Sequence, residues 1–208
     1  MISSWLRTQI DQDAVPGYAE TFNRIRAQIG RDGSAAVLNA RLPELISGWY
    51  RHTYHPFIRL GYGVEFNVDS EIAAGLAYLS LLGSNPTLAH RADQAMSDSG
   101  DVDGLFAGAA ACQLRPKGRM FDERANLMID HPAFAALILP QSLSLRALSR
   151  TALKVFAATS DFFALHLVTA SHAWRALKPY IGPDREPRQG RPRFQTRPYL
   201  CAAGGALR

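Results

Sequence analysis

Two histidines and a threonine stand inside an otherwise apolar run of residues towards the C-terminal part of the chain. His166, Thr169 and His172 follow one another at intervals of three residues, between Phe162 and Trp174. A neutral imidazole is costly to bury unless its N–H group finds a hydrogen-bond partner. An imidazole can also serve as a general acid or base, or as a metal ligand. These residues are therefore the centre of a candidate polar site.

Helix geometry limits what the two histidines can do by themselves. On a straight helix, His166 and His172 would point roughly 120° apart and lie about 9 Å apart along the axis. They are therefore poorly placed to coordinate one small ion together. A π-bulge or kink near Thr169 would bring them closer. The alternative is that both are structural histidines bonded to backbone carbonyls. Partners for buried rings must come from another helix, and four upstream side chains qualify: His55, Tyr62, Glu65 and Asn67.

The upstream segment 54–66 also sets a histidine and a carboxylate among large apolar residues and glycines. His55 precedes Pro56, and a residue before proline is disfavoured in the α region, so we expect an extended segment here. A fixed backbone would orient His55 as a metal ligand or a base. The same sequence is equally consistent with an ordinary histidine in a turn. His52 follows Arg51 and is expected to face water.

Lys154 lies in an apolar stretch, between Leu153 and Val155. Its ammonium group can reach the surface by extending its side chain, or the lysine can be neutral or covalently modified. If the chain breaks at residues 159–161, a tight helical hairpin would place Lys154 beside His166. If the helix continues, the two residues lie about 18 Å apart and cannot share a site.

The hydrophobic pattern predicts an all-α fold, a multi-helix bundle with an irregular C-terminal tail. Apolar residues recur at helical spacing, and no convincing period-two strand appears. Thr159, Ser160 and Asp161 are either a polar interruption or the N-cap of the last strong helix. The predicted helices cover residues 18–29, 34–52 (kinked or divided at Pro43), 71–82, 105–114, 121–139, 142–159 and 162–178.

Composition separates a helical domain over residues 1–181 from a basic tail over residues 182–208. Six arginines and four prolines fall in the tail against two acidic residues, so the tail carries four of the five net positive charges. The body is close to neutral, and nucleic-acid binding is not expected. No apolar run is long enough to predict a membrane span. With two cysteines in unrelated contexts, the expected location is the reducing cytoplasm.

Two motifs in this chain resemble those of the questin oxidase family. They are His55-Pro-Phe-Ile-Arg-Leu-Gly-Tyr-Gly-Val-Glu65 and Leu165-His-Leu-Val-Thr-Ala-Ser-His-Ala-Trp-Arg175, with a weaker echo at Phe121-Asp-Glu-Arg124. The family is similar to helical oxygenases that act on aromatic polyketides by Baeyer-Villiger-type or ring-cleaving oxidation. The resemblance implies that this chain is shorter at its N-terminus than its relatives, and that the basic tail replaces their final helices.

The resemblance also implies a site and its cofactors. A histidine-rich non-haem iron centre would use His55, His166 and His172, with Lys154 as a further, carboxylated ligand. His55, His172 and Thr169 would be the catalytic side chains. NADPH is a candidate electron donor, and the expected partner is an aromatic small molecule. In a metal-free version, His55 or His172 would act as base on a phenol. The alternative function is a non-catalytic helical remnant or a small-molecule binding module.

Overall fold

The computed structural model describes residues 15–91, 102–135 and 144–181, and within these ranges the chain forms helices and no strand. The predicted all-α class is therefore confirmed. The α-helices are α2 (Tyr18–Asp32), α3 (Ser34–Leu45), α4 (His55–Glu65), α5 (Asp69–Leu82), α6 (Pro86–Arg91), α7 (Val102–Ala111), α8 (Phe121–Ile129), α9 (Pro132–Ala135), α10 (Leu145–Thr159) and α11 (Phe162–Leu177), with 3₁₀ turns η1 (Ile46–Gly48) and η2 (Lys178–Tyr180).

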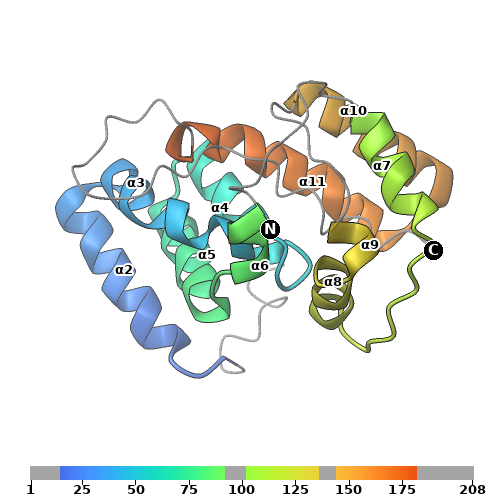
Figure 1. The fold of residues 1–208 in the computed structure, drawn as a ribbon. Coiled ribbons are helices and arrows are strands. Elements are labelled where there is room, and N and C mark those ends of the chain that lie inside the picture. Colours follow the sequence, from blue (N-terminus) through green and yellow to red (C-terminus); the bar gives the residue numbers. More distant parts are fainter. Residues whose placement is uncertain (1–14, 92–101, 136–143, 182–208) are drawn as a thin grey trace.

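Helix α4 lies at the centre of the fold, between α5 and α11 (Figure 1). Glycines let the three helices come close together. A Cβ atom on Gly61 of α4 would lie 2.5 Å from the Cβ of Ala173 in α11, and one on Gly75 of α5 would lie 2.8 Å from the Cβ of Leu60. Such separations are far inside van der Waals contact. The glycine at position 61 of the His55 segment is thus explained by helix packing.

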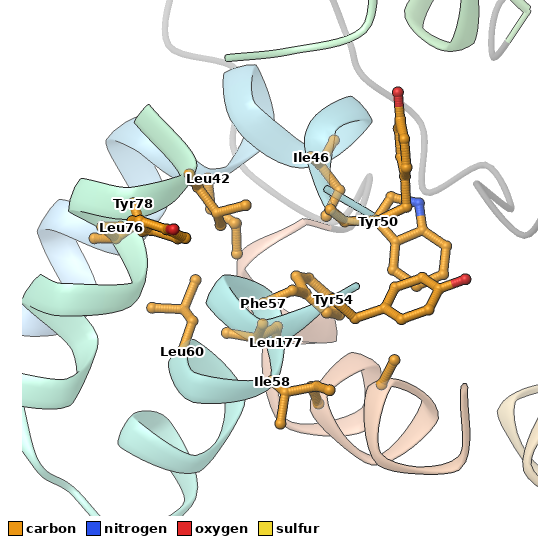
Figure 2. Packing of buried hydrophobic residues seen from close by; sticks show 14 of the residues in the cluster. Leu42, Ile46, Tyr50, Tyr54, Phe57, Ile58, Leu60, Leu76, Tyr78 and Leu177 are labelled. Atoms are coloured by element: carbon orange, nitrogen blue, oxygen red, sulfur yellow. The ribbon is translucent and has the colours of Figure 1, made fainter. Parts of the chain in front are cut away.

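The main apolar core gathers around this helix, with contributions from α3, α4, α5 and α11. Figure 2 shows its buried side chains, among them Leu42, Phe57, Leu60, Leu76 and Leu177. Three aromatic rings extend the core towards the site, because Trp49 packs against both Phe57 and Trp174. The core therefore fixes α4 relative to α11, the two helices that carry the candidate residues.

Helices α10 and α11 form a tight hairpin, which is one of the two arrangements that the sequence left open at residues 159–161. Ser160 adopts a left-handed conformation with φ of 50° and ends α10. Asp161 then caps α11, because its carboxylate accepts hydrogen bonds from the backbone N–H groups of Phe163 and Ala164. Helix α11 continues without a π-bulge through Thr169, so the straight-helix geometry holds for its two histidines.

Two expectations for segments that contain a proline differ from the structure. His55 is the first residue of α4 and is not extended, because Tyr54 takes the irregular conformation instead, with φ of 66°. Pro56 then occupies the first helical turn, where its missing N–H group costs nothing. The helix expected over residues 121–139 is also wrong, since it stops at Ile129 and a separate short helix starts at Pro132. His131 lies between the two helices, directly before that proline.

Several predictions fall partly or wholly outside the described residues. The boundary between the helical domain and the tail over residues 182–208 is one, and the end of the helix expected up to residue 139 is another. Within the described ranges the helical part reaches Tyr180 through η2. None of the helices in these ranges is both long and apolar enough to cross a lipid bilayer.

Candidate functional site

The rings of His55 and His166 meet between the start of α4 and the second turn of α11. Their Nε2 atoms lie 2.8 Å apart, and the ring centroids are separated by 4.8 Å. His166 is buried, whereas His55 is partly buried. The partner of His166 thus comes from another helix, as its burial required, and it is one of the four upstream side chains that the sequence suggested.

The contact of the second ring nitrogen, Nδ1, shows which nitrogen of His166 carries the hydrogen. Its Nδ1 atom lies 2.7 Å from the carbonyl oxygen of Phe162, one turn earlier in the helix. A carbonyl can only accept, so Nδ1 carries the hydrogen and the Nε2 of neutral His166 presents a lone pair towards His55. This arrangement, with the far nitrogen held by a backbone carbonyl, is also the one that orients metal-bound histidines.

His55 has two ways to meet that lone pair. With its proton on Nε2 it donates to His166, and its own Nδ1 becomes a bare acceptor. With its proton on Nδ1 the two lone pairs face each other, which only a proton or a metal cation between them would stabilise. The Nδ1 atom of His55 is buried and has no hydrogen-bond partner among the described residues. Each arrangement leaves the pair able to take up a proton or a cation.

The surroundings of His55 keep its ring neutral at neutral pH. The pKa of His55 is lowered to about 4, mainly by burial and also by positive charge at His166 and His52. A neutral imidazole is the form that accepts protons and binds metals. The site therefore holds His55 in its reactive form across the physiological range.

Aromatic rings border the histidine pair on the α11 side. Phe162 packs edge-on against His166 with ring centroids 4.3 Å apart, although Phe162 is 60% exposed. Phe163, its neighbour, stacks on Phe121 from the start of α8. The polar pair thus lies next to an apolar surface of phenyl rings.

His52 belongs to the same region, contrary to the expectation that it faces water. Its ring is 5.8 Å from that of His55 and 5.3 Å from that of Tyr78, and its Nδ1 atom is buried with no hydrogen-bond partner among the described residues. Its backbone N–H donates to the carboxylate of Asp122 on α8, at 2.6 Å. Neither residue received a role in the site from the sequence, although Asp122 falls in the weaker motif at residues 121–124, because their proximity depends on an irregular turn that no local pattern predicts.

His172 lies with a different set of partners, at the other end of the contact between α4 and α11. Its Nε2 atom is 3.8 Å from an oxygen of Glu65, and Arg175 holds the same carboxylate at 3.2 Å. The Tyr62 ring lies 5.6 Å away. About a third of the His172 side chain is exposed. The structure therefore does not join His172 to the pair formed by His55 and His166.

Thr169 and Lys154 also make other contacts. The hydroxyl of Thr169 lies 3.0 Å from the carbonyl oxygen of His166, inside its own helix. Lys154 forms an ion pair with Asp103 of α7 at 3.0 Å, and more than half of its side chain is exposed. The hairpin break that would place Lys154 beside His166 is present, but the ammonium group turns towards α7.

The two paired imidazoles fit adjacent positions around one metal ion. Histidine nitrogens bind such ions at about 2.0–2.1 Å, so two of them at a right angle are about 3 Å apart, close to the observed 2.8 Å. However, no group of three or more histidine, cysteine or carboxylate side chains in the described residues is placed to hold a metal. Catalytic iron centres usually have three protein ligands, so the ligand set within these residues is incomplete.

Comparison with known proteins places the chain in a family. The profile of the Questin oxidase-like family matches residues 3–193. The chain belongs to this family, and the resemblance read from its two motifs is confirmed. It is also 30% identical over 112 residues to Baeyer-Villiger oxidase ptaJ of Pestalotiopsis fici, a match that covers 50% of this chain and 22% of that protein. The aligned part of this chain therefore corresponds to about a fifth of the length of that relative. No solved structure matches significantly.

Proposed function

We propose that this protein is an oxidase of aromatic polyketide-like molecules and that the pair formed by His55 and His166 is its reactive centre. Membership of the Questin oxidase-like family and the name of the fungal relative support the reaction class. The observation that carries the assignment of the site is the approach of the two Nε2 atoms to 2.8 Å. Burial keeps His55 neutral and able to accept a proton, but its lowered pKa makes it a weak base, so the proton has to be shared with His166.

The pair is suited to removing a proton from a phenol. With the His55 hydrogen on its buried Nδ1, the two facing Nε2 lone pairs take up the phenolic proton, which ends on Nε2 of His166. His166 becomes the imidazolium, and its Nδ1–H remains bonded to the carbonyl of Phe162, which disperses the positive charge. The product is an electron-rich phenolate. General base catalysis of this kind contributes roughly 10²–10⁴-fold to a rate.

Dioxygen is the proposed oxidant, and the overall reaction is an oxygen insertion. One oxygen atom enters the bond between a ketone carbon and its neighbour, and the other leaves as water. That second atom needs two electrons and two protons, for which NADPH with a solvent proton is the proposed source. Non-haem iron would activate dioxygen if bound, with His55 and His166 as two ligands. The step at the phenol needs only the two imidazoles.

The phenyl rings beside the pair favour an aromatic substrate. Phe162 is largely exposed while its ring touches His166. Stacked or edge-on aromatic contacts stabilise a bound ring beyond the burial of its area, by about 0.5–1.5 kcal/mol per pair. A flat polycyclic phenol could therefore lie against Phe162 with its hydroxyl directed at the histidines.

Oxygen uptake with 1,8-dihydroxyanthraquinone and with a hydroxylated aromatic ketone tests the proposal. The protein is assayed with and without NADPH, after chelator treatment and after addition of ferrous iron. We expect uptake that falls at least about 100-fold in His166→Gln and changes little in His172→Gln, whose ring lies at the other end of the helix contact. Equal losses in the two variants, or no uptake under any condition, would overturn the proposal.

A non-catalytic binding module is the second candidate function. The incomplete set of metal ligands in the described residues favours it. Under this alternative the phenol still binds at the histidine pair, and its visible absorption shifts towards the phenolate spectrum without any consumption of oxygen. Spectral binding with no uptake, abolished in His166→Gln, would support the binding module over the oxidase.

A further inference from the structure

The backbone just before His55 adopts an uncommon conformation. His52, Thr53 and Tyr54 have φ values of 51°, 55° and 66°, so three consecutive residues lie in the left-handed region. None of them is glycine. Residues with a side chain visit this region as single residues and at an energetic cost, because Cβ approaches the next carbonyl oxygen. A run of three persists only where surrounding groups hold it in place.

The carboxylate of Asp122 is the group that holds this turn. Its Oδ1 atom accepts the backbone N–H of His52 at 2.6 Å, and the backbone N–H of Thr53 lies near enough to lower the pKa of the same carboxyl group. Successive backbone N–H groups in such a turn form a concave site for an anion. Here the anion is a side chain from α8, 70 positions away in the sequence.

Burial and hydrogen bonding act in opposite directions on Asp122. Burial raises the pKa of its carboxyl group, whereas the backbone N–H of His52 and positive charge at His52 and Arg51 favour the ionised form. A partly buried carboxylate needs such donors to remain charged. The turn and the carboxylate therefore stabilise each other.

Helix α8 is itself anchored to the residues before the turn. The hydroxyl of Tyr50 donates to the side-chain oxygen of Asn126 at 2.5 Å, and the amide of Asn85 donates to the Tyr50 hydroxyl at 2.7 Å. Tyr50 and Asn85 are buried. The position of Asp122 on α8 is thus fixed relative to the chain that enters the turn.

The turn 52–54 determines where α4 begins and where the His55 ring lies. The backbone N–H of His55 donates to the carbonyl of His52 at 3.2 Å, and that of Ile58 donates to the carbonyl of Tyr54 at 2.8 Å. Released from the left-handed conformation, the turn would shift the first residue of α4. An imidazole approach of 2.8 Å tolerates little displacement.

We propose that Asp122 is a positioning residue, which holds the turn 52–54 and thereby keeps His55 against His166. The proposal deepens the proposed function and rests on it, because it names a residue on which the same reactive pair depends. Asp122 acts through the backbone of His52 and needs no contact with the substrate.

Nuclear Overhauser effects between the His55 and His166 ring protons measure the pair directly in the metal-free protein. We expect Asp122→Ala to lower their intensity at least threefold while the protein remains folded. The matched control is Asp130→Ala, which removes another carboxylate that ties α8 to a neighbour, through the hydroxyl of Thr87 at 3.1 Å. That variant should keep the full intensity. An unchanged intensity in Asp122→Ala, or an equal reduction in Asp130→Ala, would overturn the proposal.

A glycine rescue separates positioning from general disruption of the structure. Glycine adopts the left-handed region without strain, so adding Thr53→Gly to Asp122→Ala should restore at least half of the missing Overhauser intensity. Should Asp122→Ala fail to fold, Asp122→Asn replaces it, since its amide oxygen keeps one acceptor but has no charge. We expect a reduction of about twofold there, recovered by Thr53→Gly, and an unchanged intensity would contradict the proposal.

The Overhauser intensity is independent of turnover, so the two proposals fail separately. If Asp122→Ala separates the two rings but the wild-type protein consumes no oxygen, the positioning role holds and the oxidase assignment fails. If the wild type consumes oxygen and Asp122→Ala keeps both the ring pairing and turnover, the oxidase assignment holds and the positioning role fails.

Discussion

The two ends of the contact between α4 and α11 carry the same residue type in different surroundings. At one end His166 is buried, faces the partly buried ring of His55 and has a phenyl ring beside it. At the other end His172 is about one-third exposed and lies beside an ion pair between Glu65 and Arg175. His166 and His172 belong to one sequence motif, but they form two different sites. The burial of each histidine and the charge of its partner distinguish these sites.

The order of the contacts explains why one helix pair can hold both sites. Contacts advance from His55 with His166, through Gly61 with Ala173, to Glu65 with Arg175. The two helices therefore run in the same sense, and the close approach at Gly61 lies between the two ends. We expect the buried end to perform chemistry and the exposed end to contribute little more than a surface ion pair.

The largest expected effect comes from widening the helix contact at its middle. In Gly61→Ala the new Cβ would lie 2.5 Å from the Cβ and 2.6 Å from the Cα of Ala173. Relief of such a clash requires backbone movement, so the unfolding free energy should fall by about 1–3 kcal/mol. Urea denaturation measures this change.

Gly30→Ala in α2 is the matched control for the glycine substitution. A Cβ at Gly30 meets no atom within 4 Å, and alanine is favoured over glycine in a helix, so this variant should be stabilised by about 0.5–1 kcal/mol. A destabilisation of Gly30→Ala comparable to that of Gly61→Ala would contradict the close-approach explanation.

The second effect concerns the pH dependence of the buried end. The pKa of His55 is about 4 in the folded metal-free protein and 6.5 in the unfolded chain. Between these values the unfolded chain binds a proton that the folded protein does not, so stability falls as pH falls from about 6.5 to 4. Because the ring is partly exposed, we expect the unfolding free energy to fall by only about 1–2 kcal/mol over this pH range.

His55→Gln removes that titration and leaves the other groups in place. The unfolding free energy of the wild type should therefore fall more steeply than that of His55→Gln between pH 6.5 and 4, with parallel curves above about pH 7. Thermal or urea unfolding across this range measures the difference. Identical slopes in the two proteins would show that the His55 ring is not shielded from solvent.

The smallest effect is expected at the exposed end. Arg175 donates to Glu65 at 3.2 Å, but 62% of its side chain is exposed, and exposed ion pairs stabilise proteins by about 0–1 kcal/mol. Arg175→Ala should therefore change the unfolding free energy by less than about 1 kcal/mol. A destabilisation of about 2 kcal/mol or more in urea denaturation, beyond the range of such pairs, would give the exposed end a structural importance equal to that of the buried end.

Much of the helical architecture could be predicted from the sequence. Local signals determine the helix 162–177, whose start is set by the cap at Asp161 and whose apolar face is continuous. The same signals predicted α5, although the helix begins at Asp69 itself. The proline rule gave the wrong conformation at His55, because the three residues before it take up the irregular backbone instead.

The candidate site was predictable only in part. The need for a partner to the buried His166 ring pointed to four upstream side chains, of which the structure brings His55 to it, since no side chain of the surrounding apolar run can bond to an imidazole. The separation of His172 from this pair depends on the relative direction of α4 and α11, which no local pattern specifies. Asp122 and His52 received no role in the site for the same reason, because tertiary contacts between α8 and the turn bring them together.

The central claim is that the buried pair, and not His172, receives the phenol. The most direct test is a ring ¹H–¹⁵N spectrum of the metal-free protein, recorded before and after addition of 1,8-dihydroxyanthraquinone. We expect the ring nitrogens of His55 and His166 to shift, with His166 moving towards the imidazolium, while those of His172 keep their positions. A shift confined to His172 would instead place the reactive centre at the exposed end and rule out the buried pair.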